Sequence, residues 1–231
     1  MVHVKTGLKG VGLLIVLLLI DTIVQSIYFG LVTVKSNLGM IVFAAVLMLG
    51  ALFGMMYPVI KRLRRTSRIY DLKPITMVDV SHTLTYAIII LIGNYLITYA
   101  HVLFNGAPAK IADNQATLNT FVTPHLVLGL VILVLIVAPI IEEVMFRGVL
   151  INMILGRFSF WTKVVVSGFA FGLFHVIGTS FQLTALLEYS FMGMVLGYAF
   201  LKTNRLESSM MLHFTNNFIA VVPMIATLFQ H

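Results

Sequence analysis

The chain has 231 residues and no cysteine, so it forms no disulfide bond and offers no thiolate nucleophile or cysteine metal ligand. Charge is scarce as well: Asp, Glu, Lys and Arg make up 10% of the sequence, whereas 60% is hydrophobic. Soluble domains are about half apolar and about a quarter charged, which excludes an ordinary soluble fold. Disorder is excluded too, because a chain this apolar cannot stay solvated.

Long hydrophobic runs are what the sequence contains instead. Apolar segments occupy residues 8–33, 38–60, 81–104, 125–155, 162–178, 183–202 and 209–229. A membrane-spanning helix needs about 20 apolar residues. We therefore predict an all-α, polytopic transmembrane bundle of about seven spans, within a range of six to eight. We divide it into residues 1–80 (a transmembrane hairpin and a basic cytoplasmic loop), 81–124 (the third span and an external loop) and 125–231 (the remaining spans).

Basic residues exceed acidic ones, 15 to 8, and they flank the hydrophobic runs. Cytoplasmic loops and anionic lipid headgroups explain this arrangement, so we expect a bilayer and no nucleic acid as partner. The segment 61–80 is the most basic. Placing it in the cytoplasm puts the amino terminus there as well. We predict an integral membrane protein with its amino terminus in the cytoplasm.

Two adjacent acids interrupt the fourth apolar segment, where an unpaired charge is costly. Glu143 and Arg147 lie four residues apart on one helical face and can pair. Glu142 is rotated about 100° from that face and is left as a free carboxylate, a plausible general base. The alternative is an ion pair that only holds helices together.

Two further motifs place histidines in apolar helices. His175 follows Gly168 and Gly172, a small-residue face that lets a neighbouring helix approach closely. His213 and Asn217 lie four apart and can point into one cavity, where they could donate hydrogen bonds to an oxyanion. A packing role for His175, and interhelical hydrogen bonds for the other two, are the alternatives.

Together these groups suffice to activate a water molecule and to stabilise a tetrahedral intermediate. A glutamate and two histidines would equally suit a catalytic zinc site. The motifs H-E-x-x-H and G-x-S-x-G, typical of other hydrolases, are absent.

The three motifs, Glu142-Glu143 with Arg147, Phe171 with His175, and His213 with Asn217, resemble the signature motifs of the CPBP family. That family unites type II CAAX prenyl endopeptidases with bacterial Abi proteases and bacteriocin-immunity proteins. The resemblance implies an intramembrane protease of a bacterial plasma membrane, with residues 125–231 as its catalytic core. The active site would lie in a cavity inside the bilayer. The resemblance also implies that Glu142 is the general base, assisted by His175, and that His213 and Asn217 stabilise the oxyanion. Glu143, Arg147 and Phe171 would support the site.

The resemblance leaves the cofactor open: either none, or one divalent metal such as zinc held by Glu142, His175 and His213. We expect an endopeptidase that cleaves a peptide or a membrane protein through a glutamate-activated water. Two alternatives stand beside it: a non-catalytic scaffold or bacteriocin-immunity protein that acts by contact, and a small proton-coupled transporter.

Overall fold

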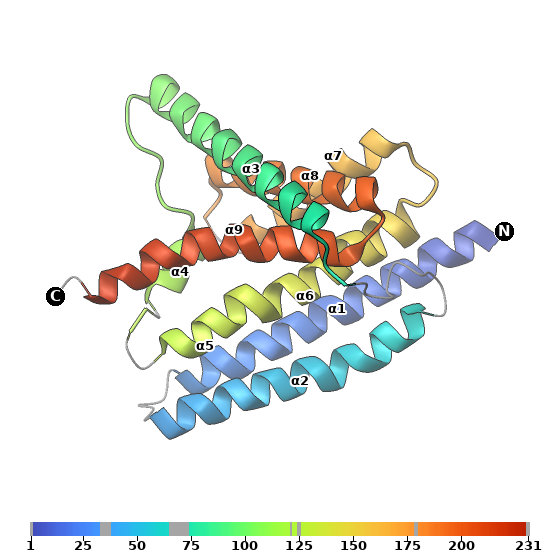
Figure 1. Cartoon of the computed structure of the whole chain (residues 1–231), viewed down its shortest axis with the longest axis horizontal. Coiled ribbons are helices and arrows are strands. Elements are labelled where there is room, and N and C mark those ends of the chain that lie inside the picture. Colours follow the sequence, from blue (N-terminus) through green and yellow to red (C-terminus); the bar gives the residue numbers. More distant parts are fainter. Residues whose placement is uncertain are drawn as a thin grey trace.

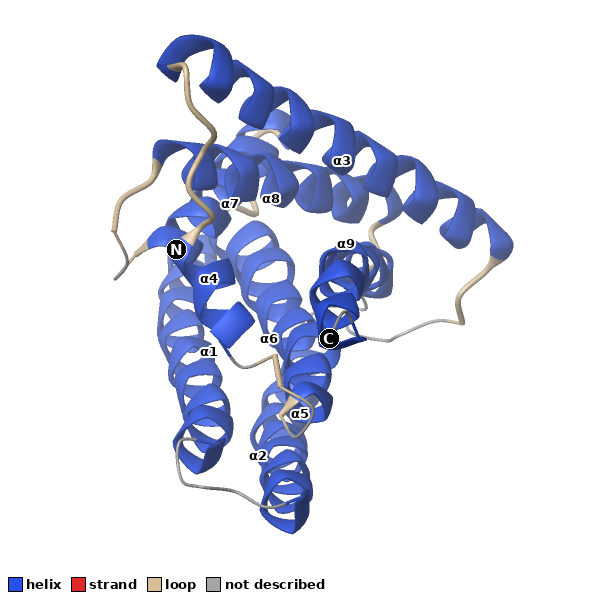
Figure 2. Cartoon of the chain, turned by 90° about the vertical axis from the view of Figure 1, so that its left-hand side faces the viewer, coloured by secondary structure: helices blue, strands red, loops and turns tan. Residues whose placement is uncertain are grey.

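The computed structural model describes residues 2–32, 38–64, 74–120, 122–123, 126–177 and 180–229, and these contain helices and no strand (Figure 2). The elements are α1 (Val2–Val32), α2 (Leu38–Arg64), α3 (Met77–Asn105), α4 (Asp113–Thr120), α5 (Val127–Ile132), η2 (Leu133–Val137), α6 (Ala138–Glu143), η3 (Val144–Ile154), α7 (Phe160–Val176), α8 (Leu183–Thr203), α9 (Leu206–Ala226) and η4 (Thr227–Phe229). The basic loop predicted within 61–80 falls largely on residues 65–73, which lie outside the described residues.

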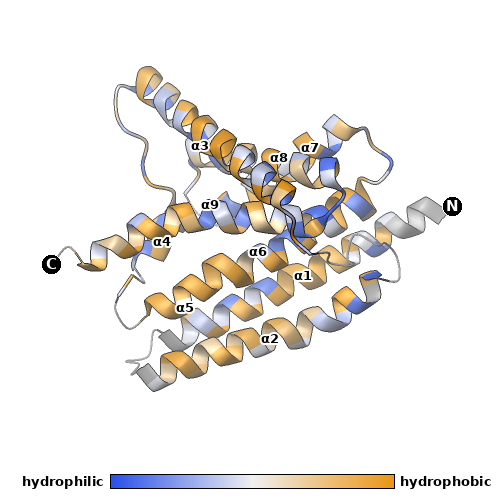
Figure 3. Ribbon diagram, viewed as in Figure 1, coloured by the Kyte–Doolittle hydropathy of each residue, from blue (hydrophilic) through white to orange (hydrophobic). Residues whose placement is uncertain are grey.

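Within the part of the chain that the structure describes, six helical segments are long and apolar enough to cross a membrane, and they coincide with six of the predicted apolar segments. The remaining one, predicted at 162–178, is α7, an apolar helix of 17 residues. Hydrophobic residues cover most of the helices (Figure 3), and many large apolar side chains, such as Phe53 and Tyr95, face outward. Such a surface is stable in lipid, so the structure confirms a polytopic helical membrane protein.

The helices α1 and α2 lie side by side, and α1 also packs along η3 (Figure 1). Tyr28 of α1 is fully buried and donates a hydrogen bond from its hydroxyl to the carbonyl oxygen of Leu126, over 2.7 Å. Its ring lies against Gly129, where any side chain would collide with it. This contact fixes α1 beside the start of the fourth apolar segment.

The fourth segment is one continuous helical path from α5 through η2 and α6 to η3. Both η2 and η3 are π-helical, which is a wider turn that often occurs at functional sites. The two adjacent acids, Glu142 and Glu143, end α6 between the two π-helical stretches.

Helices α7 and α8 form the most extensive contact between elements, through the small-residue face predicted from Gly168 and Gly172. A Cβ atom at Gly172 would lie 2.8 Å from the carbonyl oxygen of Leu186 and 2.9 Å from the amide nitrogen of Ser190. One at Gly168 would lie 2.8 Å from the carbonyl oxygen of Ser190. The backbones of α7 and α8 are therefore in direct contact, as the glycine spacing predicts.

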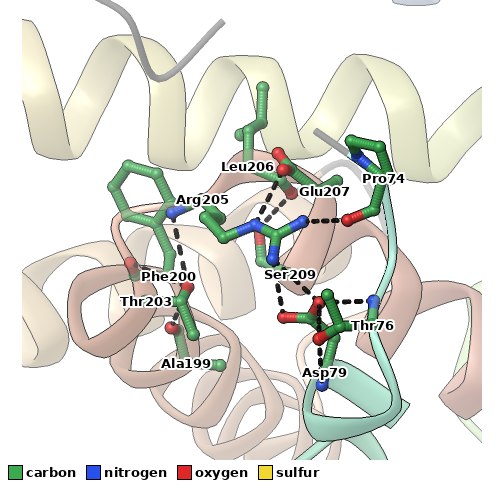
Figure 4. Close-up of polar contacts among 10 residues, drawn as sticks. All are labelled: Pro74, Thr76, Asp79, Ala199, Phe200, Thr203, Arg205, Leu206, Glu207 and Ser209. Carbon is green, nitrogen blue, oxygen red and sulfur yellow. Dashed lines mark hydrogen bonds and ion pairs between the residues drawn. The ribbon is translucent and has the colours of Figure 1, made fainter. Parts of the chain in front are cut away.

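Helix α3 packs on α8 and α9 and is otherwise largely exposed (Figure 1). Its first turn is tied to the α8–α9 turn by Arg205 (Figure 4). The guanidinium donates to both carboxylate oxygens of Asp79, at 3.0 and 2.8 Å, to Glu207 at 2.8 Å and to the carbonyl oxygen of Pro74 at 2.8 Å. Asp79 also caps the helix by accepting the backbone N–H of Thr76. One arginine thus holds both the start of α3 and its cap.

Candidate active site

A cavity of about 810 Å³ opens between α1, α3, α4, α7, α8, α9 and the fourth helical segment. Four of the predicted site residues line it: Glu142 from α6, His175 from α7, and His213 and Asn217 from α9. The supporting residues Glu143, Arg147 and Phe171 lie behind this wall, each with none of its surface exposed. Residues that the sequence separates by up to 75 positions therefore share one cavity.

Glu142 stands between the two histidines. Its Oε2 atom lies 3.8 Å from Nε2 of His175 and 3.8 Å from Nε2 of His213. These distances exceed that of a direct hydrogen bond. Only 5% of the surface of Glu142 is exposed, and within the described residues its Oε2 has no hydrogen-bond partner. A carboxylate and two imidazole nitrogens therefore converge on one place without contacting one another directly.

The orientation of His175 is set by its own helix and by two aromatic rings. Its Nδ1 lies 2.9 Å from the carbonyl oxygen of Phe171, one turn earlier. A carbonyl oxygen only accepts, so Nδ1 carries the hydrogen and the neutral ring has its lone pair on Nε2. The imidazole stacks between Phe171 and Tyr189, each with its ring centroid at 4.4 Å. The lone pair is thereby directed at Glu142.

His213 is held by the second acid. Its Nδ1 lies 3.0 Å from Oε1 of Glu143, and the same oxygen is 3.2 Å from Nη1 of Arg147. The i,i+4 pairing of Glu143 with Arg147 is the one that their spacing predicts. Oε1 of Glu143, which contacts the guanidinium, accepts the hydrogen of Nδ1 of His213, and Nε2 of His213 is left to face Glu142. The two adjacent glutamates thus differ in their contacts: Oε1 of Glu143 binds Arg147 and His213, whereas Oε2 of Glu142 lies near two imidazoles without a hydrogen bond.

Arg147 is the largest fully buried side chain and connects several elements. Its Nη2 donates to the carbonyl oxygen of Gly193 on α8, at 2.9 Å, and its guanidinium lies 5.2 Å from the ring centroid of Phe171. A buried cation needs such partners, because its desolvation is costly. Phe171 accordingly touches both Arg147 and His175, which explains why an aromatic residue stands one turn before the histidine.

Asn217 is positioned by a proline in the fourth helical segment. The N–H of Ala138 bonds to Leu133, five residues earlier. The same π-helical register would pair residue 139 with Val134, but Pro139 has no N–H. The carbonyl oxygen of Val134 instead accepts Nδ2 of Asn217, at 2.9 Å. One of the two amide hydrogens of Asn217 is thus engaged, and the other remains available beside the cavity.

The cavity is also lined by polar residues outside the predicted site. Glu188 of α8 lines it and accepts a hydrogen bond from the hydroxyl of Thr98 on α3, at 2.6 Å. Asp21 of α1 and Asn94 of α3 line it as well. The signal for all of them is a polar residue inside an apolar run, but the sequence does not show which face of its helix turns inward.

A metal ion was one possibility for this site. The donor types fit zinc, since two imidazole nitrogens and a carboxylate form a known catalytic set. Their arrangement does not: among the described residues, no group of three His, Asp or Glu side chains is placed closely enough to hold a metal ion. We therefore derive no step through a metal.

Residues 124–219 match the sequence profile of the family described as type II CAAX prenyl endopeptidase Rce1-like. The matched stretch contains the four cavity residues and the three buried supporting residues. It confirms the resemblance that the three motifs indicate, over nearly the same part of the chain. Neither the curated proteins nor the solved structures give a significant match.

Proposed function

From the membership of residues 124–219 in the Rce1-like type II CAAX prenyl endopeptidase family, we propose that this chain is an intramembrane endopeptidase. It hydrolyses a peptide bond of a peptide or a membrane protein, and a water molecule activated by Glu142 is the nucleophile. The observation that carries the proposal is the unpartnered Oε2 of Glu142, 3.8 Å from two imidazole Nε2 atoms.

Glu142 and His175 are the proposed base and its assistant. A water molecule between the carboxylate and the two imidazoles donates one hydrogen to Oε2 of Glu142 and the other to Nε2 of His175. Both acceptors carry lone pairs directed at this place, and this leaves the oxygen lone pair free to attack a carbonyl carbon. Glu142 then holds the proton that the leaving amine requires.

His213 and Asn217 are the proposed oxyanion donors. Asn217 has a free amide hydrogen, whereas neutral His213 carries no hydrogen on Nε2. His213 therefore donates to the oxyanion only as an imidazolium ion, and the ionised Glu143 at its Nδ1 stabilises that form. Fixed donors at a developing oxyanion are typically worth about 10²–10³ in rate each.

The test is cleavage of a mixed peptide library by purified protein in lipid, read by mass spectrometry beside Glu142→Gln. New peptide termini are expected with the wild type and none above background with the variant, because an amide cannot accept the proton. Both proteins must elute as monodisperse species. Equal termini from both would overturn Glu142 as the base, and no termini from either would favour a scaffold or immunity role exerted by contact.

A chelator separates the glutamate mechanism from a metal-dependent one. Activity of the wild type is expected to survive dialysis against a chelator of divalent metals, because the proposed steps need only side chains and water. Loss of activity that added zinc restores would show instead that Glu142, His175 and His213 rearrange around a metal ion.

A further inference from the structure

Asp21 is a buried carboxylate in the interior of the first span. Only 5% of its surface is exposed, and it lies within the membrane-crossing part of α1, Gly7–Gly30. An ionisable group at this depth is costly unless it is paired or serves a function. It also lies outside the matched stretch 124–219, so the family resemblance assigns it nothing.

The two oxygens of Asp21 have different surroundings. Oδ2 accepts Nε2 of Gln25, one turn along the same helix, at 2.8 Å. Oδ1 is buried and has no hydrogen-bond partner in the described part of the chain. The glutamine therefore orients the carboxylate and leaves one oxygen unused.

The cavity that Asp21 lines is the candidate active-site cavity, which Glu142 lines as well. Among the described residues around this cavity, the buried polar atoms without a partner are Asp21 Oδ1, Asn94 Oδ1 and Glu142 Oε2. All three are acceptors. These three unpartnered atoms offer hydrogen-bond acceptors to a molecule that enters the cavity.

Among the described residues, no lysine or arginine forms an ion pair with Asp21. Lys110 lines the cavity, but its charge acts on Asp113 of α4, and the described residues show no ion pair between Lys110 and Asp21. Arg147 is committed to Glu143 and Gly193 behind the cavity wall. A donor-rich cation would have to come from outside.

We propose that Asp21 is a specificity-determining residue that binds a lysine or arginine side chain of the substrate, within a few residues of the scissile bond. The inference rests on the proposed endopeptidase function and names its substrate class: peptides or membrane-protein segments with a basic side chain. The basic group donates a charge-assisted hydrogen bond to the unpartnered Oδ1 of Asp21. Asn94 accepts a further N–H of the same substrate.

The experiment compares substrate preference in the wild type, Asp21→Asn and Glu188→Gln with the mixed peptide library. Both variants remove one negative charge from the cavity, but Glu188 already has a partner in Thr98. Enrichment of Lys or Arg at one position is expected with the wild type and with Glu188→Gln. With Asp21→Asn, kcat/KM for the basic peptides should fall at least about tenfold, mainly through KM, because a charged hydrogen bond is lost.

The ratio of kcat/KM for basic to neutral peptides separates loss of this contact from a general loss of activity, and monodisperse elution of Asp21→Asn shows that the variant folds. A library cleaved without basic preference, or a preference that Asp21→Asn retains, would overturn the inference and leave the endopeptidase function standing. Equal loss in Glu188→Gln would also overturn it, since the preference would then come from the net charge of the cavity.

A binding measurement covers the case in which nothing is cleaved. Glu142→Gln protein is incubated with the same library, and the retained peptides are compared with those retained by the double variant Asp21→Asn, Glu142→Gln. Retention of basic peptides by the first protein alone supports the role of Asp21 independently of turnover. Equal retention by both would contradict it.

Discussion

At the scale of the residue, the site depends on giving two chemically identical neighbours opposite environments. Glu143 contacts Arg147 and His213 and is fully buried, whereas Glu142 turns one step round the helix and lines the cavity. Glu143 thus contacts a histidine and an arginine behind the cavity wall, and Glu142 is the acid that a molecule in the cavity can reach. Helical rotation of about 100° per residue suffices to separate these roles.

The same amide substitution is therefore expected to act differently at the two positions. Glu143→Gln removes the counter-charge of the fully buried Arg147, and breaking such a pair costs about 3–5 kcal/mol of stability. Its midpoint of thermal unfolding in detergent should fall well below that of the wild type. Glu142→Gln should match the wild type, because Glu142 makes no such pair. The readout is loss of the monodisperse chromatographic peak after heating, and a reversed order would contradict the assignment.

At the scale of the element, the position of helix α7 depends on two residues that have no side chain. Glycines at 168 and 172 bring its backbone onto α8, and the last turn then carries His175 to the cavity. In the fourth helical segment, Pro139 has no backbone N–H to donate. The carbonyl oxygen of Val134 is therefore free to accept a hydrogen bond from Asn217. Local sequence thus sets helix geometry, and helix geometry places the side chains.

A methyl group at Gly172 is expected to destabilise the protein by about 1–3 kcal/mol, the usual effect of overpacking, and to lower activity through displacement of His175. The matched control is Gly50→Ala in α2, where an added Cβ meets nothing within 4 Å. That change should leave stability equal or slightly higher, because alanine is the better helix former. Thermal midpoints of the two variants provide the comparison, and equal midpoints would argue against close α7–α8 packing.

At the scale of the whole molecule, the cavity is lined in part by residues outside the stretch that matches the family. Asp21 and Gln25 come from α1, and Asn94 and Thr98 come from α3, all outside residues 124–219. Helix α3 is held at its start by Arg205 and beside the cavity by Glu188, while most of its surface is free for lipid. The amino-terminal helices therefore form part of the site wall and do more than anchor the protein.

Orientation in the membrane can be tested in a chain without cysteine, because a single introduced thiol has no background. The positive-inside pattern predicts that the loop after α3 lies outside and the end of α8 lies in the cytoplasm. We expect an impermeant maleimide to label Ala107→Cys in intact cells and Lys202→Cys only after permeabilisation; both positions are exposed. The opposite labelling pattern would reverse the predicted orientation.

The sequence by itself determined the membrane-helix class, the approximate number of spans and the identity of the polar residues within them. These follow from local properties, since hydrophobic length and the cost of buried charge act residue by residue. Spacing also determined the Glu143–Arg147 pair and the close α7–α8 face, because both depend on helical periodicity alone.

Only the tertiary structure decided which of these polar residues meet. The 3.8 Å distances from Glu142 to the two histidines, the bond from His213 to Glu143, and the place of Asp21 in the cavity depend on helices far apart in sequence. Such contacts arise from the rotation, depth and register of packed helices. Those are set by the fit of many side chains together, and no single segment encodes them.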